Sequence, residues 1–180
     1  MIETGRLILR RFHKDDWKDL YDYLSQESVV AYEPYGVFSE EQSRQEAINR
    51  SQNEAFLAVC LKEGQKLIGN IYFARQEPEE FMTWEIGYVF HPAYYGKGYA
   101  TEAGKGVLSY AFEVLGAHRV VAYCNPENTA SWRLLERLSM RREGYFKKPA
   151  FFVTTDEGKP LWHDAYQYAV LEEEFKGANA

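Results

Sequence analysis

Apolar and polar residues alternate across residues 84–90, and a helical pattern follows soon afterwards. The alternation has the period of two that predicts a β-strand, and Pro92 ends it because proline cannot continue a hydrogen-bonded ladder. Across residues 100–115, apolar residues recur at three- and four-residue spacing, which predicts an amphipathic helix. Gly116 stands where a residue that follows a helix is often glycine. The chain is therefore expected to be organised around a strand, a glycine-rich turn and a helix.

The same patterns predict the other elements. Strands are expected at residues 6–12, 56–61, 67–73, 119–124, 151–153 and 166–170, and helices at residues 15–24, 39–50 and 129–138. Ser39 and Gln42 have the spacing of a helix capping box, whereas residues 32–38 are aromatic, interrupted by Pro and Gly, and expected to be irregular. Helices that alternate with strands around a central hairpin predict an α/β (α+β) fold, a mixed sheet flanked by helices.

Composition limits the kinds of protein that this chain can be. With 180 residues, 46% of them hydrophobic and 27% charged, residues 1–180 are expected to form a single domain with a substantial core. A net charge of −6 argues against a nucleic-acid binder. No apolar run approaches membrane length and no signal peptide is recognisable, so we expect no membrane partner and a cytoplasmic location. Cys60 and Cys124 fit no metal spacing and are expected to be buried free thiols, and the histidines form no ligand motif, so no metal is expected.

The turn Gly96-Lys97-Gly98 lies between the predicted strand and helix. The first turn of a helix has unpaired N–H groups and the positive end of the helix dipole, and glycines let an anion approach the backbone. This turn is a candidate phosphate site to which Lys97 adds a cation. The alternative is a tight turn that only packs the helix on the sheet. The spacing matches neither a P-loop nor the dinucleotide fingerprint.

Three polar residues are candidates for chemistry at the site. Glu85 shares a strand face with Gly87, where a glycine often marks a bulge or a close backbone approach, so its carboxylate is a candidate general base. Ser131 is the polar residue on the leucine-rich face of its helix, although its hydroxyl could instead bond to its own helix. Asn128 is most simply the N-cap of that helix. A glutamate on a solvated face remains the alternative for Glu85.

Aromatic residues gather at two places. Tyr32, Tyr35 and Phe38 are candidates for the wall of a substrate site, and Tyr95 and Tyr99 flank the glycine turn. Packing in the core or on the surface is the alternative for both groups.

Taken in order along nearly the whole chain, these motifs resemble the GNAT superfamily of N-acetyltransferases, and most closely its branch of ribosomal-protein N-terminal acetyltransferases. The marks are Thr4-x-Arg6-Leu7-x-Leu9-Arg10, Glu85-Ile86-Gly87-Tyr88, Tyr95-Gly96-Lys97-Gly98-Tyr99-Ala100-Thr101-Glu102-Ala103, Asn128-x-x-Ser131, Glu143-Gly144, Asp164 and Tyr168. The pyrophosphate motif of the superfamily is Gln/Arg-x-x-Gly-x-Gly/Ala. Its first position holds Tyr95 here, whereas Gly98 and Ala100 match.

The resemblance implies a GNAT fold, with a twisted, mostly antiparallel sheet that is splayed between the strands at 84–90 and 119–124. It also implies acetyl-CoA as co-substrate and an amine-bearing protein, peptide or small molecule as partner. A homodimer is left open. By this similarity the residues that would bind the cofactor are Tyr88, Val89, Phe90, Tyr95, Gly96, Lys97, Gly98, Tyr99, Ala100, Thr101, Asn128 and Ser131.

The resemblance further implies direct acetyl transfer, with Glu85 as the base and backbone N–H groups near Tyr88 and Val89 at the oxyanion. Ser131 or a water would protonate the thiolate. Many members use a tyrosine for that step, and this chain has Leu135 at the matching position. Many also have Leu-Gly-Phe after the helix, where this chain has residues 138–140 as Leu-Ser-Met.

The acceptor is expected to be a protein or peptide α-amine, with a polyamine or an antibiotic amine as the alternative. A non-catalytic acyl-CoA-binding domain is the alternative from another class.

Overall fold

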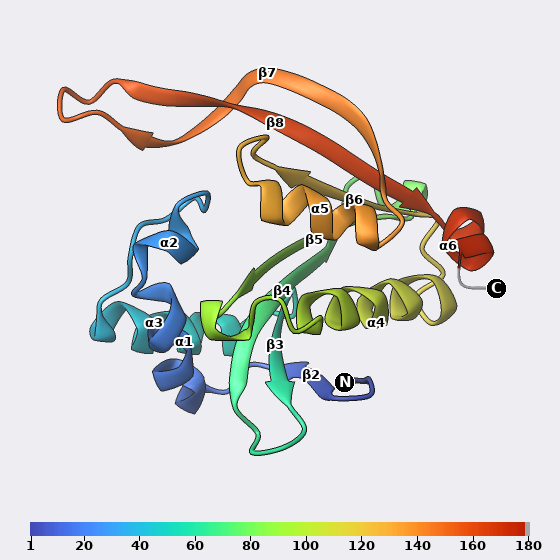
Figure 1. Cartoon of the computed structure of the whole chain (residues 1–180), viewed down its shortest axis with the longest axis horizontal. Helices are drawn as coiled ribbons and strands as arrows, with labels where there is room; N and C mark the ends of the chain where they lie inside the picture. Colours follow the sequence, from blue (N-terminus) through green and yellow to red (C-terminus); the bar gives the residue numbers. More distant parts are fainter. Residues whose placement is uncertain (179–180) are drawn as a thin grey trace.

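The computed structural model describes residues 1–178, which contain one eight-stranded sheet (Figure 1). The strands are β1 (Ile2–Glu3), β2 (Leu7–Arg11), β3 (Phe56–Leu61), β4 (Leu67–Arg75), β5 (Thr83–Phe90), β6 (Arg119–Cys124), β7 (Arg141–Thr154) and β8 (Pro160–Leu171). Their order in the sheet is β1-β2-β3-β4-β5-β6-β8-β7. All neighbouring strands are antiparallel except β5 and β6, which are parallel. The predicted mixed, mostly antiparallel sheet is confirmed.

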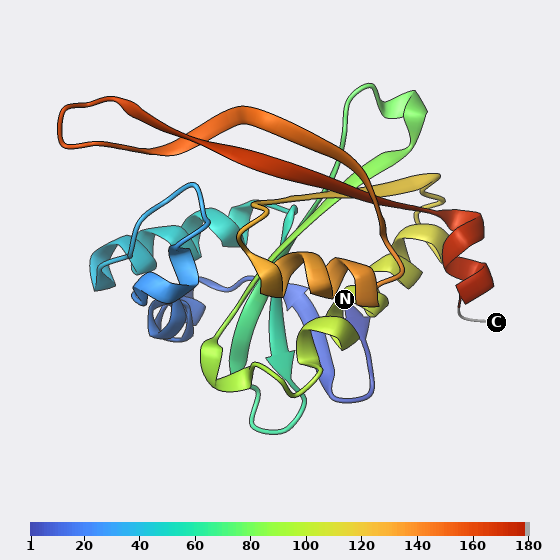
Figure 2. The ribbon, with the colours of Figure 1, turned by 45° about the horizontal axis from the view of Figure 1, so that its top comes forward.

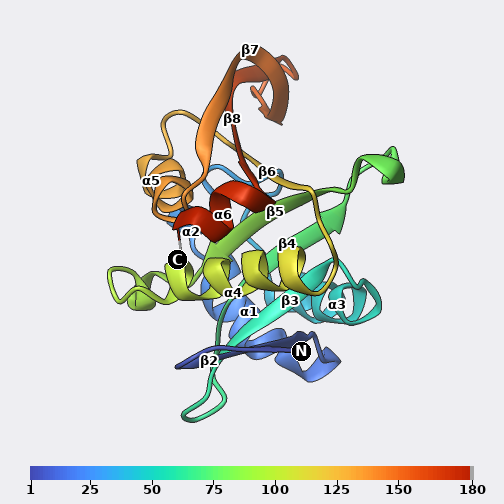
Figure 3. The same cartoon turned by 90° about the vertical axis from the view of Figure 1, so that its right-hand side faces the viewer.

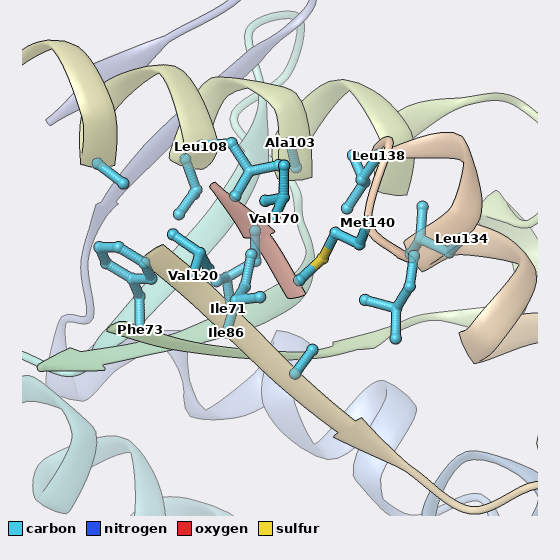
Figure 4. Packing of buried hydrophobic residues seen from close by; sticks show 14 of the residues in the cluster. Ile71, Phe73, Ile86, Ala103, Leu108, Val120, Leu134, Leu138, Met140 and Val170 are labelled. Atoms are coloured by element: carbon cyan, nitrogen blue, oxygen red, sulfur yellow. The ribbon is translucent and has the colours of Figure 1, made fainter. Parts of the chain in front are cut away.

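Helices cover both faces of this sheet (Figure 3). They are α1 (Trp17–Leu24), α2 (Glu27–Val30), α3 (Glu40–Gln52), α4 (Tyr99–Glu113), α5 (Thr129–Arg137) and α6 (Glu172–Ala178), with short 3-10 turns η1 (Lys14–Asp16), η2 (Glu79–Phe81) and η3 (Pro92–Tyr94). The larger core lies where α4 and α5 meet the sheet, and there Ile86, Val120 and Leu108 are almost fully buried (Figure 4). A smaller core joins α1, α2 and α3 to the other face.

The parallel pair β5 and β6 is joined only at its beginning. Thr83 pairs with Arg119, Trp84 with Val120 and Glu85 with Val121, and no later pair follows. The two strands then separate (Figures 1 and 2). The predicted splay is therefore confirmed, and beyond Glu85 one backbone edge of β5 has no described strand beside it.

The predicted helix starts have the expected hydrogen bonds. The backbone N–H of Gln42 donates to Ser39 Oγ at 3.2 Å, and the N–H of Ser39 donates to Gln42 Oε1 at 2.8 Å. Asn128 Oδ1 accepts from the N–H of Ser131 at 3.2 Å, so Asn128 is the N-cap of α5. Each cap satisfies helix N–H groups that have no partner within the helix.

Several predicted boundaries are wrong. β7 and β8 are much longer than residues 151–153 and 166–170, because nearly every residue of β7 is exposed and no alternation marks its length. α2 and α6 were not predicted. α4 ends at Glu113 rather than Leu115, although Gly116 has the expected positive φ of 63°.

Candidate active site

The side chains of β5 point alternately to the two faces of the sheet. Ile86 belongs to the core beneath α4, whereas Val89 packs with residues of α1 and α2 in the smaller core. Because successive strand residues point to opposite faces, Glu85 and Gly87 share the face of Val89, and Tyr88 shares the face of Ile86. The residue proposed as base and the tyrosine of the same motif therefore lie on different sides of the sheet.

A cavity of about 1700 Å³ extends through the splay between β5 and β6. It is bordered by the glycine turn, the start of α4, the α2–α3 connection and the β7–β8 hairpin. Glu85, Ser131, Asn128, Tyr32 and Tyr35 all line it. The cavity thus brings together most of the residues that sequence analysis selected from four separate segments.

The glycine turn has a backbone conformation that favours glycine. Gly96 and Gly98 have φ values of 72° and 80°, in the left-handed region. A Cβ at Gly96 would meet no atom within 4 Å, and a Cβ at Gly98 would meet only an Arg6 guanidinium nitrogen at 3.5 Å, so the space above the turn is open. The first helical hydrogen bond of α4 runs from Glu102 N–H to Gly98 O, which leaves the N–H groups of the preceding residues free for an anion.

The N-terminal segment holds this turn in place. Arg6 donates from Nε to Glu102 Oε2 at 2.7 Å and from Nη1 to the carbonyl of Lys97 at 3.1 Å. Thr4 Oγ1 donates to Glu102 Oε1 at 2.6 Å. Burial alone would raise the pKa of Glu102, but the hydrogen bonds from Thr4 and Arg6 outweigh it and lower the pKa. These contacts explain the Thr-x-Arg motif, because they fix α4 and neutralise a carboxylate beside the proposed anion site.

Glu85 is half-buried at the point where β5 and β6 separate. Burial raises its pKa above the usual value for a glutamate, which makes its carboxylate a better proton acceptor. Burial, and secondly the charge of Glu85, raise the pKa of Tyr72 and of Tyr123. The bulge considered at Gly87 is absent, because β4 and β5 pair without a register shift and Gly87 lies directly opposite Tyr72. A Cβ at Gly87 would lie 3.7 Å from Cβ of Tyr72, so the tyrosine packs over this glycine.

Ser131 is held by Tyr88 across the splay. The Tyr88 hydroxyl lies 2.9 Å from the Ser131 carbonyl, to which it donates, and 3.0 Å from Ser131 Oγ. Burial raises the pKa of Tyr88, so the phenol stays protonated. Sequence analysis predicted that Tyr88 binds the cofactor, and it predicted no role for the side chain of Tyr88. The side-chain contact joins residues 43 positions apart and has no signal in the local sequence.

Leu135 does not face the cavity. Its side chain is 1% exposed in the larger core, whereas the preceding Leu134 lines the cavity. The hydroxyl-bearing residues of this helix that line the cavity are Thr129 and Ser131.

Two of the selected side chains lie outside the cavity lining. Phe38 packs at the edge of the smaller core, with its ring 5.2 Å from that of Tyr35. Lys97 is exposed, and its Nζ lies 5.3 Å from the centre of the Tyr94 ring. Cys60 is buried as expected, whereas Cys124 is only partly buried, and both are free thiols.

Three residues that sequence analysis missed also line the cavity. Phe152 and His163 come from the β7–β8 hairpin, and their ring centres are 4.5 Å apart. Glu33 comes from the α2–α3 connection. Burial raises the pKa of Glu33 to about 7, although Tyr35 and Arg50 act in the opposite direction. The sequence signal that could have identified Glu33 is the position of a carboxylate between Tyr32 and Pro34, in an irregular aromatic segment.

Residues 1–178 contain no candidate metal cluster and no helix of membrane-spanning character. No group of three or more His, Cys, Asp or Glu side chains in this part of the chain could hold a metal ion. No helix within it is long and apolar enough to cross a membrane.

Known proteins resemble this chain over most of its length. A family model described as an acetyltransferase (GNAT) domain matches residues 6–141. A Bacillus subtilis protein named uncharacterized N-acetyltransferase YnaD is 42% identical, over 97% of this chain and 98% of its own. A GNAT-family acetyltransferase from Bacillus anthracis has a solved structure with a TM-score of 0.85 and 41% identity, over 96% of this chain and 98% of its own.

A relative with a named substrate is more distant. The [ribosomal protein uS5]-alanine N-acetyltransferase of Escherichia coli is 30% identical, over 81% of this chain and 80% of its own. The predicted resemblance to GNAT enzymes and to their ribosomal-protein branch is confirmed by these matches.

Proposed function

Because the chain belongs to the GNAT acetyltransferase family, we propose that it transfers the acetyl group of acetyl-CoA to the N-terminal α-amine of a protein or peptide. The observation that carries the proposal is Glu85, a half-buried carboxylate with a raised pKa, in a cavity that also reaches the glycine turn. Donor and acceptor can both enter this cavity.

The donor end fits an anionic cofactor. Gly96 and Gly98 keep the space above the turn open, and the free N–H groups at the start of α4 can bind pyrophosphate oxygens. Beyond Glu85, the backbone edge of β5 that faces the splay is free to pair with an extended chain such as the pantetheine arm. Acetyl-CoA supplies the activated acetyl thioester.

Glu85 takes the proton of the attacking amine, directly or through one water. The backbone N–H of Tyr88, which points to the edge of β5 away from β4, stabilises the negative charge that develops on the carbonyl oxygen. The amine nitrogen bonds to the thioester carbon and the C–S bond breaks. The departing thiolate takes a proton from a water or from Ser131, which is held by Tyr88 and regains its proton from solvent. Holding both reactants in one cavity removes much of the entropic barrier.

The preference for an α-amine follows from proton affinity. An α-amine has a pKa near 7.7–8.0, against about 10.4 for lysine. Deprotonating a lysine thus costs roughly 3.3 kcal/mol more, and a lone carboxylate base is better matched to the α-amine. The printed name of the E. coli relative, an alanine N-acetyltransferase, supports the same choice.

The test uses two matched peptides and measures thiol release with acetyl-CoA. One peptide has a free N-terminus and no lysine, and the other is N-blocked with one lysine. Release with the first peptide is expected. Release confined to the blocked peptide would refute the α-amine, and release only with a polyamine or an aminoglycoside would move the acceptor to a small amine.

A further inference from the structure

Glu33 lies in the acceptor half of the cavity. The α2–α3 connection that carries it follows Val29 and Val30, which pack with Val89 in the smaller core. This is the face of β5 that also presents Glu85. Both carboxylates therefore border the same side of the cavity.

Glu33 has no ionic partner of its own. Among residues 1–178 it forms no ion pair, and the nearest cation that acts on it is Arg50. Arg50 is 1% exposed, and its Nε is bound to Glu46 at 2.7 Å. The carboxylate of Glu33 is half-buried and lines the cavity without an ion pair, although a hydrogen bond from Tyr35 and the charge of Arg50 both act on it.

Charge is distributed unevenly along the cavity. The lysine and arginine that line it, Lys105 and Arg137, belong to α4 and α5 at the donor end. Arg137 donates to Thr101 Oγ1 at 3.3 Å, beside the glycine turn. In the acceptor half, Glu33 and Glu85 face the cavity with no lining lysine or arginine beside them. A partly desolvated site that has two carboxylates and no lysine or arginine in its lining favours the binding of a cation.

We propose that Glu33 binds a second positive charge of the acceptor, while Glu85 receives the reacting amine. The proposal rests on the proposed function and extends it to a specificity-determining residue. A suitable acceptor has a primary amine and a separate cationic group. That group can be a basic side chain at a peptide N-terminus or the second amine of a small diamine.

The test measures binding to the full-length chain loaded with coenzyme A, by calorimetry. Lysine amide and norleucine amide have the same α-amine and differ in the side-chain ammonium. 1,4-Diaminobutane and butylamine form the matched pair for the diamine. We expect wild-type protein to bind at least one dication about tenfold or more tightly than its monocationic match.

Glu33→Gln is expected to abolish that preference while the affinity for coenzyme A and for the monocations changes less than about twofold. Glu27→Gln is the matched control, because Glu27 lies on α2, is exposed, and is outside the cavity lining. If Glu33→Gln loses only the preference for lysine amide, the acceptor is a peptide N-terminus with a basic side chain. If it loses only the preference for 1,4-diaminobutane, the acceptor is a diamine.

A preference that survives Glu33→Gln, or no preference in the wild-type protein, would overturn the proposal. Failure of the proposed function has a different result. The protein would still bind the dication preferentially but would release no thiol when acetyl-CoA and the acceptor are both present.

Discussion

At the scale of single residues, alternation along β5 places two different chemical groups on opposite sides of one strand. Glu85 faces the acceptor half of the cavity, and Tyr88 reaches across the splay to Ser131 on α5. A strand that loses its neighbour after Glu85 can therefore supply a base on one side and position a hydroxyl on the other.

Replacement of Glu85 by glutamine keeps the shape of the side chain and removes its basicity. General-base assistance is typically worth about 10²–10⁴-fold, so kcat is expected to fall at least about tenfold, with some rescue by solvent. The affinity for acetyl-CoA should stay near that of the wild type. Glu80→Gln is the control, because Glu80 is exposed and outside the cavity lining. An unchanged kcat at saturating acceptor would make Glu85 structural, and a drop in affinity alone would assign it to binding.

Removal of the Tyr88 hydroxyl by phenylalanine tests whether this residue acts through Ser131. The change leaves the Ser131 carbonyl without its donor and is expected to cost about 1 kcal/mol of stability. We expect kcat to fall roughly tenfold, because Oγ of Ser131 also loses its partner. In a Ser131→Ala background, the same change should leave kcat nearly unaltered. Equal effects in both backgrounds would show that Tyr88 does not work through Ser131.

The charge on Glu33 should make dication binding depend on pH. With a pKa of about 7 in the free protein, Glu33 is mostly protonated at pH 6 and mostly ionised at pH 8. The ionisable side chains that interact electrostatically with Glu33 are Tyr35, Arg50 and Tyr95, the last of which lies in the segment after β5. His163 of β8 lines the same cavity.

The ratio of lysine amide to norleucine amide affinity should rise with pH, by up to roughly tenfold between pH 6 and 8. The shared α-amine cancels in this ratio. In Glu33→Gln the ratio should be flat, and a slope that persists there would show that Glu33 is not its source.

At the scale of elements, the turn between β5 and α4 combines a left-handed backbone with an open surface. Gly98→Glu places a carboxylate at the proposed pyrophosphate site, at a backbone cost of about 1–2 kcal/mol. Acetyl-CoA affinity is expected to fall at least about 100-fold, because the anions repel each other at close range.

Gly64→Glu is the matched control for this change. Gly64 has a φ of 74°, a Cβ there would meet no atom within 4 Å, and it lies in the β3–β4 turn outside the cavity lining. Gly64→Glu has the same backbone strain and the same added charge as Gly98→Glu. Because the change lies away from the cavity, the affinity for acetyl-CoA should equal that of the wild type. Unchanged affinity in folded Gly98→Glu protein would show that the turn does not bind the cofactor.

The elements also show where sequence information ends. β3 and β6 were predicted at their observed boundaries, because each has a central run of three buried apolar residues. β7 has almost no buried residue, so its length was invisible in the pattern. The caps at Ser39 and Asn128 were found because capping is a local interaction.

At the scale of the whole molecule, the cavity depends on contacts that no local pattern contains. Glu85 was identified from the strand pattern and the family motif, and Gly98 from the turn. Glu33 and the contact between Tyr88 and Ser131 exist only because distant segments meet at the splay. The motif-bearing centre of the cavity lining was therefore predictable, and so were Tyr32 and Tyr35, whereas Glu33 and the contact between Tyr88 and Ser131 were not.

The same architecture predicts how a ligand changes the stability of the whole chain. The halves β1–β5 and β6–β8 share only three paired positions within the sheet, and the cavity extends between them. A ligand that binds across this junction stabilises the folded state alone, by about 2.7 kcal/mol at a concentration of 100 times Kd. For a chain of this size, that corresponds to a rise in Tm of roughly 5–10 °C. Thermal unfolding with and without coenzyme A measures it.

In the same experiment, Gly98→Glu should show a rise of at most about 1–2 °C at that coenzyme A concentration, and Gly64→Glu should show the full rise. Amide exchange in β6 and β8, on the far side of the splay from the glycine turn, should slow when coenzyme A binds the wild-type protein. A full thermal shift in Gly98→Glu would mean that the glycine turn does not bind coenzyme A. Protection confined to α4 in the wild-type protein would mean that the ligand binds without bridging the two halves of the sheet.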